Sequence, residues 1–277
     1  MDFTIKNLGA RTVPSPLIDI YQFQDTSFGR DEDRMIFNPL MVNNDTSCLK
    51  TDQSFELAGP RKSIYFEPLK VRSAIVTCGG LCPGINDVIR SIVMESYYRY
   101  GVRSIIGIRY GYSGLDPERG YDPMELTPDL VEDIHLEGGT ILGSSRGGTE
   151  DMDILVNTLD RLRINILYTI GGDGTLRGAH KIAGIARDRG MDLAVVGVPK
   201  TIDNDISFVQ RTFGFETAYS KAVDSIYTAH IESKGAPNGI GLVKLMGRHS
   251  GFIAAHTCLA MNDANFILVP EVPFDLH

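Results

Sequence analysis

Short apolar runs that end in glycine or in a polar turn, and that lead into segments with helical periodicity, recur through most of this chain and constrain its fold more than any other feature. The apolar runs predict buried strands, and apolar residues repeating every three to four positions predict amphipathic helices. Strands are expected at 73–77, 104–108, 166–170, 193–198, 240–246 and 266–269. Their alternation with helices predicts an α/β fold with a parallel sheet, helices on both faces, and the start of a second similar unit.

Helix signals fill the intervals between these strands. Pro83, after the turn Gly79-Gly80, is expected as the first residue of one helix, because proline suits that position. Thr127 and Pro128 are expected as the cap and first residue of another helix. Further helices are expected at 151–163, behind residues 171–175 as far as Gly190, at 214–232 and at 250–261.

Residues 1–71 differ from the rest of the chain. They contain several prolines, a charged patch at 30–34 and no sustained hydrophobic period. Such a segment is typical of an extension that wraps on the surface of its own chain or on a neighbouring subunit. Short elements at best are expected within it.

The composition is that of an ordinary globular enzyme. Of 277 residues, 43% are hydrophobic and 22% charged, and the formal net charge is -8. An acidic balance without a Lys/Arg block argues against nucleic acid and anionic membrane as partners, but a local nest of amides and arginines still admits phosphorylated substrates. No run approaches the ~20 apolar residues that span a bilayer, and the start lacks a signal-peptide pattern. Four irregularly spaced cysteines favour a reduced, cytoplasmic protein and not a zinc site.

Two carboxylates follow the strand expected at 193–198. Asp203 and Asp205 belong to the heptapeptide Pro-Lys-Thr-Ile-Asp-Asn-Asp, which includes Lys200 and Thr201. Side chains two positions apart can converge on one site, where their charges repel unless a cation or a proton intervenes. The alternative is an ordinary Asp/Asn turn with solvated carboxylates.

Glycine turns follow two other strands at the same expected edge of the sheet. Backbone amides of Gly79-Gly80 and of 171–175 can approach phosphate oxygens, and Asp173 can bind Mg²⁺ together with those oxygens. The alternatives are a plain tight turn and an Asp173 that caps a helix starting at Thr175. Arg146 and Arg248 offer planar guanidinium groups for phosphates, although an isolated loop arginine is usually solvated.

These groups are the parts that phosphoryl transfer needs. Amides and arginines hold the phosphates, a carboxylate holds Mg²⁺, and another carboxylate takes the proton of the attacking hydroxyl. Ligands of open parallel sheets bind outside the carboxyl ends of the strands, where all of these segments are expected. Their convergence indicates a phosphotransferase.

The same segments resemble 6-phosphofructokinases in order and spacing. The resemblance covers about residues 72–277 and rests on Cys-Gly-Gly-Leu-Cys-Pro-Gly-Ile-Asn at 78–86, Leu-Gly-Ser-Ser-Arg at 142–146, Gly-Gly-Asp-Gly-Thr at 171–175, the heptapeptide at 199–205, Met-Gly-Arg at 246–248 and Pro-Glu-Val at 270–272. It implies a Rossmann-like nucleotide-binding domain at 72–213 and the first part of a sugar-phosphate domain at 214–277. The extension at 1–71 resembles that of the long-chain plant and protist ATP-dependent branch.

The resemblance also implies roles for single residues in the transfer of a phosphoryl group to the C1 hydroxyl of fructose 6-phosphate. Asp203 would be the base, with Arg248 stabilising charge and Thr201 and Asp205 holding the phosphoryl group and metal. Asp173 would bind Mg²⁺. The remaining nucleotide contacts would come from Gly80, Tyr112, Arg146, Gly172, Gly174, Thr175 and Lys200, and the remaining sugar contacts from Met246, Gly247 and Glu271.

The resemblance leaves two phosphoryl donors open, ATP and pyrophosphate, because this chain combines residues typical of both groups. Pyrophosphate-dependent members typically carry Asp and Lys at the positions of Gly174 and Lys200, and bacterial ATP enzymes carry Gly at both. Gly174 leaves space for the α-phosphate of ATP, so we favour ATP over pyrophosphate. A glycolytic, allosteric, cytoplasmic homo-oligomer, a dimer or a tetramer, is the expected setting.

Two departures and two rivals accompany this expectation. The family's C-terminal His/Arg segment would follow residue 277, and an arginine of many bacterial members aligns with Gly239, so residues 1–277 alone are expected to be inactive or poorly folded. Gly-Gly-Asp-Gly-Thr also occurs in NAD kinases and diacylglycerol kinases, but without the other motifs. The remaining rival is a non-catalytic regulatory subunit, against which the intact Asp203 and Arg248 count.

Overall fold

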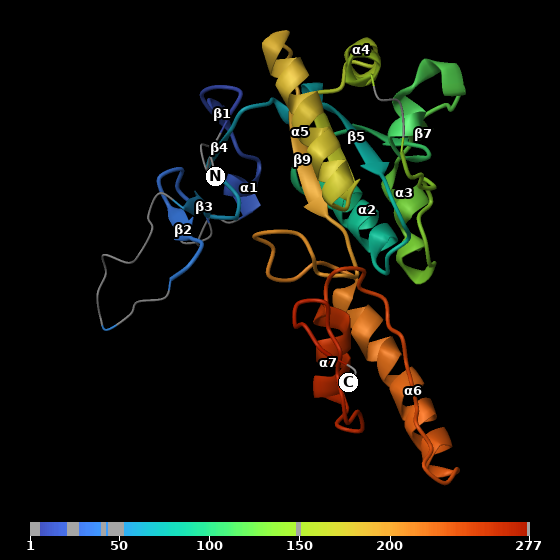
Figure 1. Ribbon diagram of the computed structural model, residues 1–277. Helices are drawn as coiled ribbons and strands as arrows, with labels where there is room; N and C mark the ends of the chain where they lie inside the picture. Colours follow the sequence, from blue (N-terminus) through green and yellow to red (C-terminus); the bar gives the residue numbers. More distant parts are fainter. Residues whose placement is uncertain (1–5, 21–27, 40–42, 44–52, 148–150, 276–277) are drawn as a thin grey trace.

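A five-stranded sheet forms the centre of the molecule (Figure 1). The computed structural model describes residues 6–20, 28–39, 43, 53–147 and 151–275. The strand order is β7-β6-β5-β8-β9, and every neighbouring pair is parallel except β6 with β7. The strands are β5 (Arg72–Thr77), β6 (Ser104–Ile108), β7 (Met124–Glu125), β8 (Ile166–Gly171) and β9 (Ala194–Pro199). The four parallel strands confirm the sequence prediction, and the short edge strand β7 was not predicted.

The order in which strands are added to the sheet reverses at β5, which pairs in parallel with β6 on one side and with β8 on the other. Such a reversal is a topological switch point, where open α/β sheets leave a crevice at the carboxyl ends of the strands. The register places Thr77 opposite Ile170, and Ile170 opposite Val198. The turns that follow β5, β8 and β9 therefore meet at one edge.

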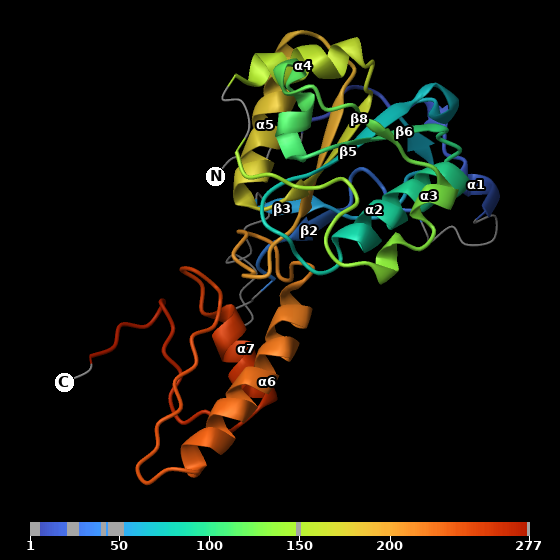
Figure 2. The ribbon, with the colours of Figure 1, turned by 90° about the vertical axis from the view of Figure 1, so that its right-hand side faces the viewer.

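Helices cover both faces of this sheet (Figure 2). Ile75 belongs to the core cluster shared with α2 (Ile85–Met94) and α3 (Pro128–Val131). Val76, one position along β5, belongs to the cluster shared with α4 (Met152–Arg161) and α5 (Asp173–Asp188). Alternate strand residues point to opposite faces, so the continuous apolar run fills both cores. Thr127 caps α3 as predicted, its side chain accepting a hydrogen bond from the Leu130 amide.

The described part of residues 1–71 contains only short elements, as expected. Two antiparallel pairs join β1 (Val13–Pro14) to β4 (Ser63–Ile64) and β2 (Arg34–Ile36) to β3 (Ser54–Glu56), beside α1 (Leu17–Ile20). The segment packs on its own chain, where the Tyr65 hydroxyl donates to the Asp192 carboxylate over 2.8 Å. The segment therefore contacts the sheet domain of the same molecule.

Two helices, α6 (Phe215–Lys234) and α7 (Phe252–Ala260), form a unit that projects away from the sheet (Figures 1 and 2). Both helices confirm the predictions at 214–232 and 250–261. They pack together near the sheet, where the rings of Phe215 and His256 lie 4.9 Å apart. No helix in the described ranges is both long and apolar enough to cross a membrane.

The strands predicted at 240–246 and 266–269 are wrong. Both segments have irregular backbone, and Ile240 and Phe266 are 90% and 88% exposed. A strand forms when its amides and carbonyls pair with a neighbouring strand. Across the described ranges no β-pairing involves either segment. Their β-like composition is therefore left without the partner that would turn it into sheet.

The prediction that Pro83 starts a helix is also wrong, by two residues. Helix α2 begins at Ile85, and Gly84 before it has a left-handed φ of 92°. The turn at 82–84 packs tightly on Gly214, where an added Cβ would lie 2.1 Å from the Cys82 sulfur and 3.1 Å from the Pro83 carbonyl oxygen. This packing keeps Pro83 in the turn. The start of α2 consequently lies outside the cleft described next.

Candidate active site

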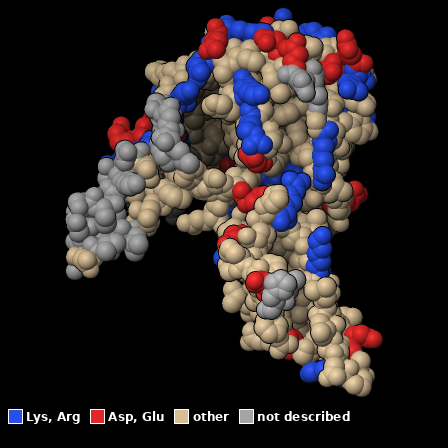
Figure 3. All heavy atoms as spheres, in the orientation of Figure 1, with Lys and Arg blue, Asp and Glu red and all other residues tan. Residues whose placement is uncertain are grey.

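A cleft of about 1330 Å³ lies at the carboxyl edge of the sheet. Its walls come from the turns after β5, β8 and β9, from the loop at 145–147 and from residues 244–248. On the face seen in Figure 3, basic and acidic side chains are interspersed around the sheet domain, while the projection of α6 and α7 is largely uncharged. Every predicted site residue except Glu271 lines this cleft: Gly80, Tyr112, Arg146, Gly172, Asp173, Gly174, Thr175, Lys200, Thr201, Asp203, Asp205, Met246, Gly247 and Arg248.

The turn after β5 is held by the loop that carries Arg146. The Gly79 amide donates to the Ser145 carbonyl over 2.8 Å, and the Ser144 hydroxyl donates to the Gly79 carbonyl over 2.7 Å. Gly79 has a left-handed φ of 85°, which glycine adopts without steric cost. A Cβ on Gly80 would stand 3.2 Å from the Arg146 guanidinium. The missing side chain therefore lets the guanidinium lie against the turn.

The turn after β8 leads directly into α5. The helix begins at Asp173 after Gly172, which provides no side-chain cap, so the alternative of Asp173 capping a helix that starts at Thr175 is wrong. The first amides of a helix have no partner within the helix and favour anions. An added Cβ on Gly174 would meet nothing within 4 Å. The helix thus presents an open N-terminus to the cleft.

Asp173 lies on the rim of this N-terminus. Its carboxylate forms an ion pair of 2.5 Å with Arg177, one turn further along α5, and its side chain is 62% exposed. Arg177 was not predicted, although its spacing of four residues is the signal that finds such pairs on helices. An exposed carboxylate is accessible to ligands.

Tyr112 packs against the first turns of α5. Its hydroxyl donates to the Thr175 carbonyl over 2.8 Å, and its ring leaves only 2.8 Å for a Cβ on Gly178. The side chain is buried, and this burial raises the pKa of the phenol. The hydroxyl is therefore used in holding the start of α5 and stays protonated.

Lys200 joins the end of β9 to the turn after β5. Its side-chain amine donates to the Gly80 carbonyl over 2.6 Å, and the residue is only 4% exposed. Burial lowers the pKa of Lys200, the thiols of Cys82 and Cys78 oppose this shift, and Arg146 adds to it. Burial also raises the pKa of each of these thiols to about 11, so both are neutral near pH 7.

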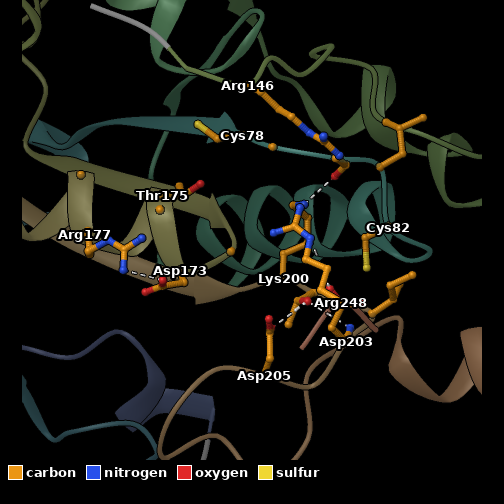
Figure 4. A pocket seen from close by; sticks show the side chains of 18 of the residues that line it. Cys78, Cys82, Arg146, Asp173, Thr175, Arg177, Lys200, Asp203, Asp205 and Arg248 are labelled. Carbon is orange, nitrogen blue, oxygen red and sulfur yellow. Dashed lines mark hydrogen bonds and ion pairs between the residues drawn. The ribbon is translucent and has the colours of Figure 1, made fainter. Parts of the chain in front are cut away.

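The carboxylates after β9 lie on a different wall of the cleft from Asp173 (Figure 4). The Thr201 hydroxyl donates to Asp205 over 3.2 Å and accepts from the Asp203 amide over 3.0 Å. Asp203 has a side chain only 11% exposed, 3.9 Å from the Arg248 guanidinium. Burial, and then the Asp205 charge, raise the pKa of Asp203, while Arg248 lowers it. Asp203 is therefore a carboxylate with increased basicity.

Two residues that the sequence did not single out hold this loop in shape. The Asn204 side chain donates to the Gln210 carbonyl over 3.1 Å and accepts from the Thr212 amide over 2.9 Å. The Thr212 hydroxyl donates to the Thr201 carbonyl over 2.6 Å. Both side chains are buried. No sequence spacing signals these contacts, because they close a loop of irregular backbone.

Glu271 is the predicted site residue that the structure does not bring to the cleft. Its carboxylate accepts a hydrogen bond of 2.8 Å from the Gly251 amide, at the start of α7. A carboxylate suits the positive end of a helix, so the contact stabilises this end. A sugar contact for Glu271 stays a prediction.

The donor set of the cleft fits Mg²⁺ bound jointly with phosphates. Within the described ranges no group of three or more His, Cys, Asp or Glu side chains is arranged to hold a metal ion. Mg²⁺ usually takes one or two carboxylates and completes its shell with phosphate oxygens and water. Asp173 offers such a carboxylate beside the open N-terminus of α5.

Sheet order, glycine turns and the open start of α5 define a doubly wound α/β protein with a cleft at its switch point. The family profile described as phosphofructokinase matches residues 72–277. The chain belongs to the phosphofructokinase family, as the sequence motifs predicted.

Relatives are similar across nearly the whole chain. The ATP-dependent 6-phosphofructokinase of Borreliella burgdorferi is 52% identical over 277 residues, which are 100% of this chain and 62% of the relative. That of Amycolatopsis methanolica is 47% identical over 279 aligned positions, covering 99% of this chain and 60% of the relative. The chain thus spans about three fifths of the length of these curated relatives. Both alignments include the extension at 1–71.

The fold is similar to that of solved phosphofructokinases. The crystal structure of Pichia pastoris phosphofructokinase in the T-state superposes with a TM-score of 0.61 and 23% identity, over 81% of this chain and 26% of that chain. At this identity the likeness supports the α/β fold and no finer assignment.

Proposed function

We propose that this protein transfers the γ-phosphoryl group of ATP to the C1 hydroxyl of fructose 6-phosphate and so produces fructose 1,6-bisphosphate. The observation that carries the proposal is the buried Asp203, 3.9 Å from Arg248, in the same cleft as the open N-terminus of α5. One end of the cleft suits a polyphosphate, and the other suits deprotonation of an alcohol. The names of the relatives support this choice of reaction.

The nucleotide phosphates bind at the start of α5. Amides of Gly172, Gly174 and Thr175 face the anion, and Arg146 adds a guanidinium from the opposite loop. Asp173 holds Mg²⁺, which neutralises phosphate charge when bound. Gly80 contributes backbone at the turn that Lys200 supports.

The sugar phosphate binds at the other end, where Asp203 accepts the proton of the C1 hydroxyl. Burial makes Asp203 more basic than an ordinary carboxylate, which improves proton transfer. Thr201 and Asp205 position the phosphoryl group in transfer, and Arg248 stabilises the charge that develops on it. Met246 and Gly247, which line the cleft beside Arg248, contact the sugar.

ATP is the proposed donor because of the space at Gly174. A side chain there would project into the open cleft, where nothing lies within 4 Å of an added Cβ. Pyrophosphate remains a second candidate because Lys200 is the residue typical of pyrophosphate-dependent members. In this structure the Lys200 amine bonds to Gly80, so its position is compatible with either donor.

The setting of the enzyme follows from the family. We propose a cytoplasmic homo-oligomer, a dimer or a tetramer, with regulation by small molecules. Light scattering of the purified native protein measures the oligomeric state, and a monomer at working concentration would contradict this part of the proposal.

The test is a coupled assay for fructose 1,6-bisphosphate with the native protein, run with ATP and with pyrophosphate, with Mg²⁺ present and with the metal chelated. We expect turnover with ATP that requires Mg²⁺. Turnover with pyrophosphate alone would replace ATP by the second candidate. Saturable ATP binding without turnover, unchanged by Asp203→Asn, would indicate a regulatory subunit instead.

A further inference from the structure

Three phenylalanines connect the N-terminal extension to the loop that carries Asp203. Phe37 directly follows β2 and Phe55 lies in β3, and we call this antiparallel pair of strands the β2–β3 hairpin. Phe208 lies in the loop at 201–212, after β9. The ring of Phe208 is 4.8 Å from that of Phe37 and 5.9 Å from that of Phe55, with interplanar angles of 76° and 60°. Phe37 and Phe55 are themselves 6.3 Å apart. These are edge-to-face contacts, the favoured arrangement of aromatic pairs.

Phe208 has a backbone that depends on its surroundings. Its φ of 67° is left-handed, a conformation that is uncommon for a bulky residue and costs free energy. A strained residue persists only where its neighbours hold it. Among the described residues, the rings of Phe37 and Phe55 contact Phe208 from outside the loop.

Two hydrogen bonds of Asn204 link the segment that carries Phe208 to the two carboxylates. Asn204 lies between Asp203 and Asp205, and its side chain bonds to the Gln210 carbonyl and the Thr212 amide. Phe208 belongs to the segment that these two bonds close. Asn204 is also left-handed, with a φ of 54°. A shift of Phe208 therefore strains these two hydrogen bonds. Because Asn204 lies between Asp203 and Asp205, the strain reaches the two carboxylates.

We propose that the β2–β3 hairpin of the extension positions the catalytic loop, through the contact of Phe37 and Phe55 with Phe208. These three are positioning residues, which act on Asp203 through Asn204. Figures 1 and 2 both draw the hairpin beside the loop that follows β9. The inference rests on the proposed function only for the role of Asp203 as the base. The mechanical link between hairpin and loop is independent of the reaction.

Hydrogen exchange of the native protein tests the link. The amides of Asp203, Val209 and Thr212 each donate a hydrogen bond within the loop and report its opening. We expect Phe208→Ala, and the double change of Phe37→Ala with Phe55→Ala, to raise exchange in the loop about tenfold. Phe208→Tyr keeps the ring and should restore the slow rate. The amides of β8 should exchange as in the wild type.

Phe266→Ala is the matched control, because Phe266 is 88% exposed and lies in the C-terminal part. It should leave exchange in the loop unchanged. Equal exchange in wild type and Phe208→Ala would overturn the proposal, and so would an increase of the same size in β8, which would indicate general destabilisation.

Kinetics separate this inference from the proposed function. In Phe208→Ala we expect the rate constant of phosphoryl transfer to fall about tenfold, while the Kd for ATP changes by less than about twofold, since the start of α5 lies outside the loop. If loop exchange in the wild type and the variants follows the prediction but the wild type transfers no phosphoryl group, the proposed function is wrong and the link between hairpin and loop is still supported. Faster loop exchange with an unchanged rate would refute the positioning role.

Discussion

The two ends of the cleft hold the same kind of side chain in opposite environments. Asp173, at the start of α5, is 62% exposed and paired with Arg177. Asp203, in the loop after β9, has a side chain only 11% exposed, and its pKa is raised mainly by burial. Both follow neighbouring strands of one sheet. The difference between them arises because a helix start presents Asp173 and a loop presents Asp203, and not from the sheet.

This contrast fits the two roles proposed above, metal ligand for Asp173 and base for Asp203. A carboxylate that binds Mg²⁺ must be accessible to the ion and its phosphate ligands, as Asp173 is at the rim of a helix N-terminus. A carboxylate that accepts a proton gains from a pKa closer to the working pH, which burial provides. Pairs of titratable groups whose environments differ in this way indicate which residue has which role.

The largest expected effect comes from the buried end. Asp203→Asn keeps the shape and removes the base, so phosphoryl transfer should fall by about 10² to 10⁴ in kcat. The Kd for ATP should change little, because the phosphates bind at α5. Steady-state kinetics with isothermal titration calorimetry measure both quantities. Asp188→Asn, at the far end of α5, is the matched control, and an Asp203→Asn enzyme with wild-type kcat would contradict the comparison.

At Asp173, the exposed carboxylate, the main expected effect is on ATP binding and not on kcat. Asp173→Asn removes the proposed metal ligand, so the Kd for ATP with Mg²⁺ should rise by tens of fold, roughly the loss of one close charge contact. Calorimetry with and without Mg²⁺ checks this effect, because binding without the metal should hardly change. An equal loss in both conditions would show that the effect does not depend on the metal, and would contradict Asp173 as its ligand.

Gly174→Asp adds a charge beside Asp173 without disturbing the fold. Nothing lies within 4 Å of the added Cβ, and aspartate in the first turn of a helix is favourable. The thermal midpoint should therefore stay or rise slightly, while ATP binding weakens about tenfold through repulsion of the phosphates. Thermal denaturation and calorimetry measure these two outcomes. A strong loss of stability would show that Gly174 is needed for the fold itself.

The smallest expected effects are shifts in pH dependence. Since burial and Asp205 raise the pKa of Asp203, the acid limb of kcat should lie at higher pH than that of an unperturbed aspartate. Asp205→Asn should move this limb to lower pH, and Arg248→Met should move it to higher pH, because Arg248 lowers the pKa. Asp173→Asn should leave it in place. A pH–rate profile of each variant measures the position of the acid limb. Shifts of Asp205→Asn and Arg248→Met in the same direction would contradict the assignment of Asp203 as the base.

The same raised pKa has a consequence for stability with a definite sign. Between the ordinary and the raised pKa, the folded protein binds more protons at Asp203 than the unfolded chain does. The free energy of unfolding therefore falls as pH rises through this window, and Asp203→Asn should remove that slope. Urea denaturation at a series of pH values measures the slope.

Much of this architecture was readable from sequence patterns. The strands at 73–77 and 166–170 were found because continuous apolar runs must be buried on both faces, and the glycines behind them marked the edge where ligands bind. The segments at 240–246 and 266–269 had the same kind of composition but are irregular, because a strand also needs a neighbour to pair with. Composition predicts the tendency to form a strand and says nothing of the partner.

The sequence by itself determined the four parallel strands, the glycine turns and the chemical identity of the carboxylates, because these follow from hydrophobic period, glycine placement and side-chain type. Only the tertiary structure decided that Asp203 is buried and Asp173 exposed, since burial depends on what packs around a loop. It also decided that Thr212 and Asn204 hold the loop that carries Asp203. Phe37 and Phe55 are about 170 and 150 residues away from Phe208 along the chain, and only the tertiary structure brings them into contact with it. Contacts between irregular segments carry no periodic signal, so only the folded chain reveals them.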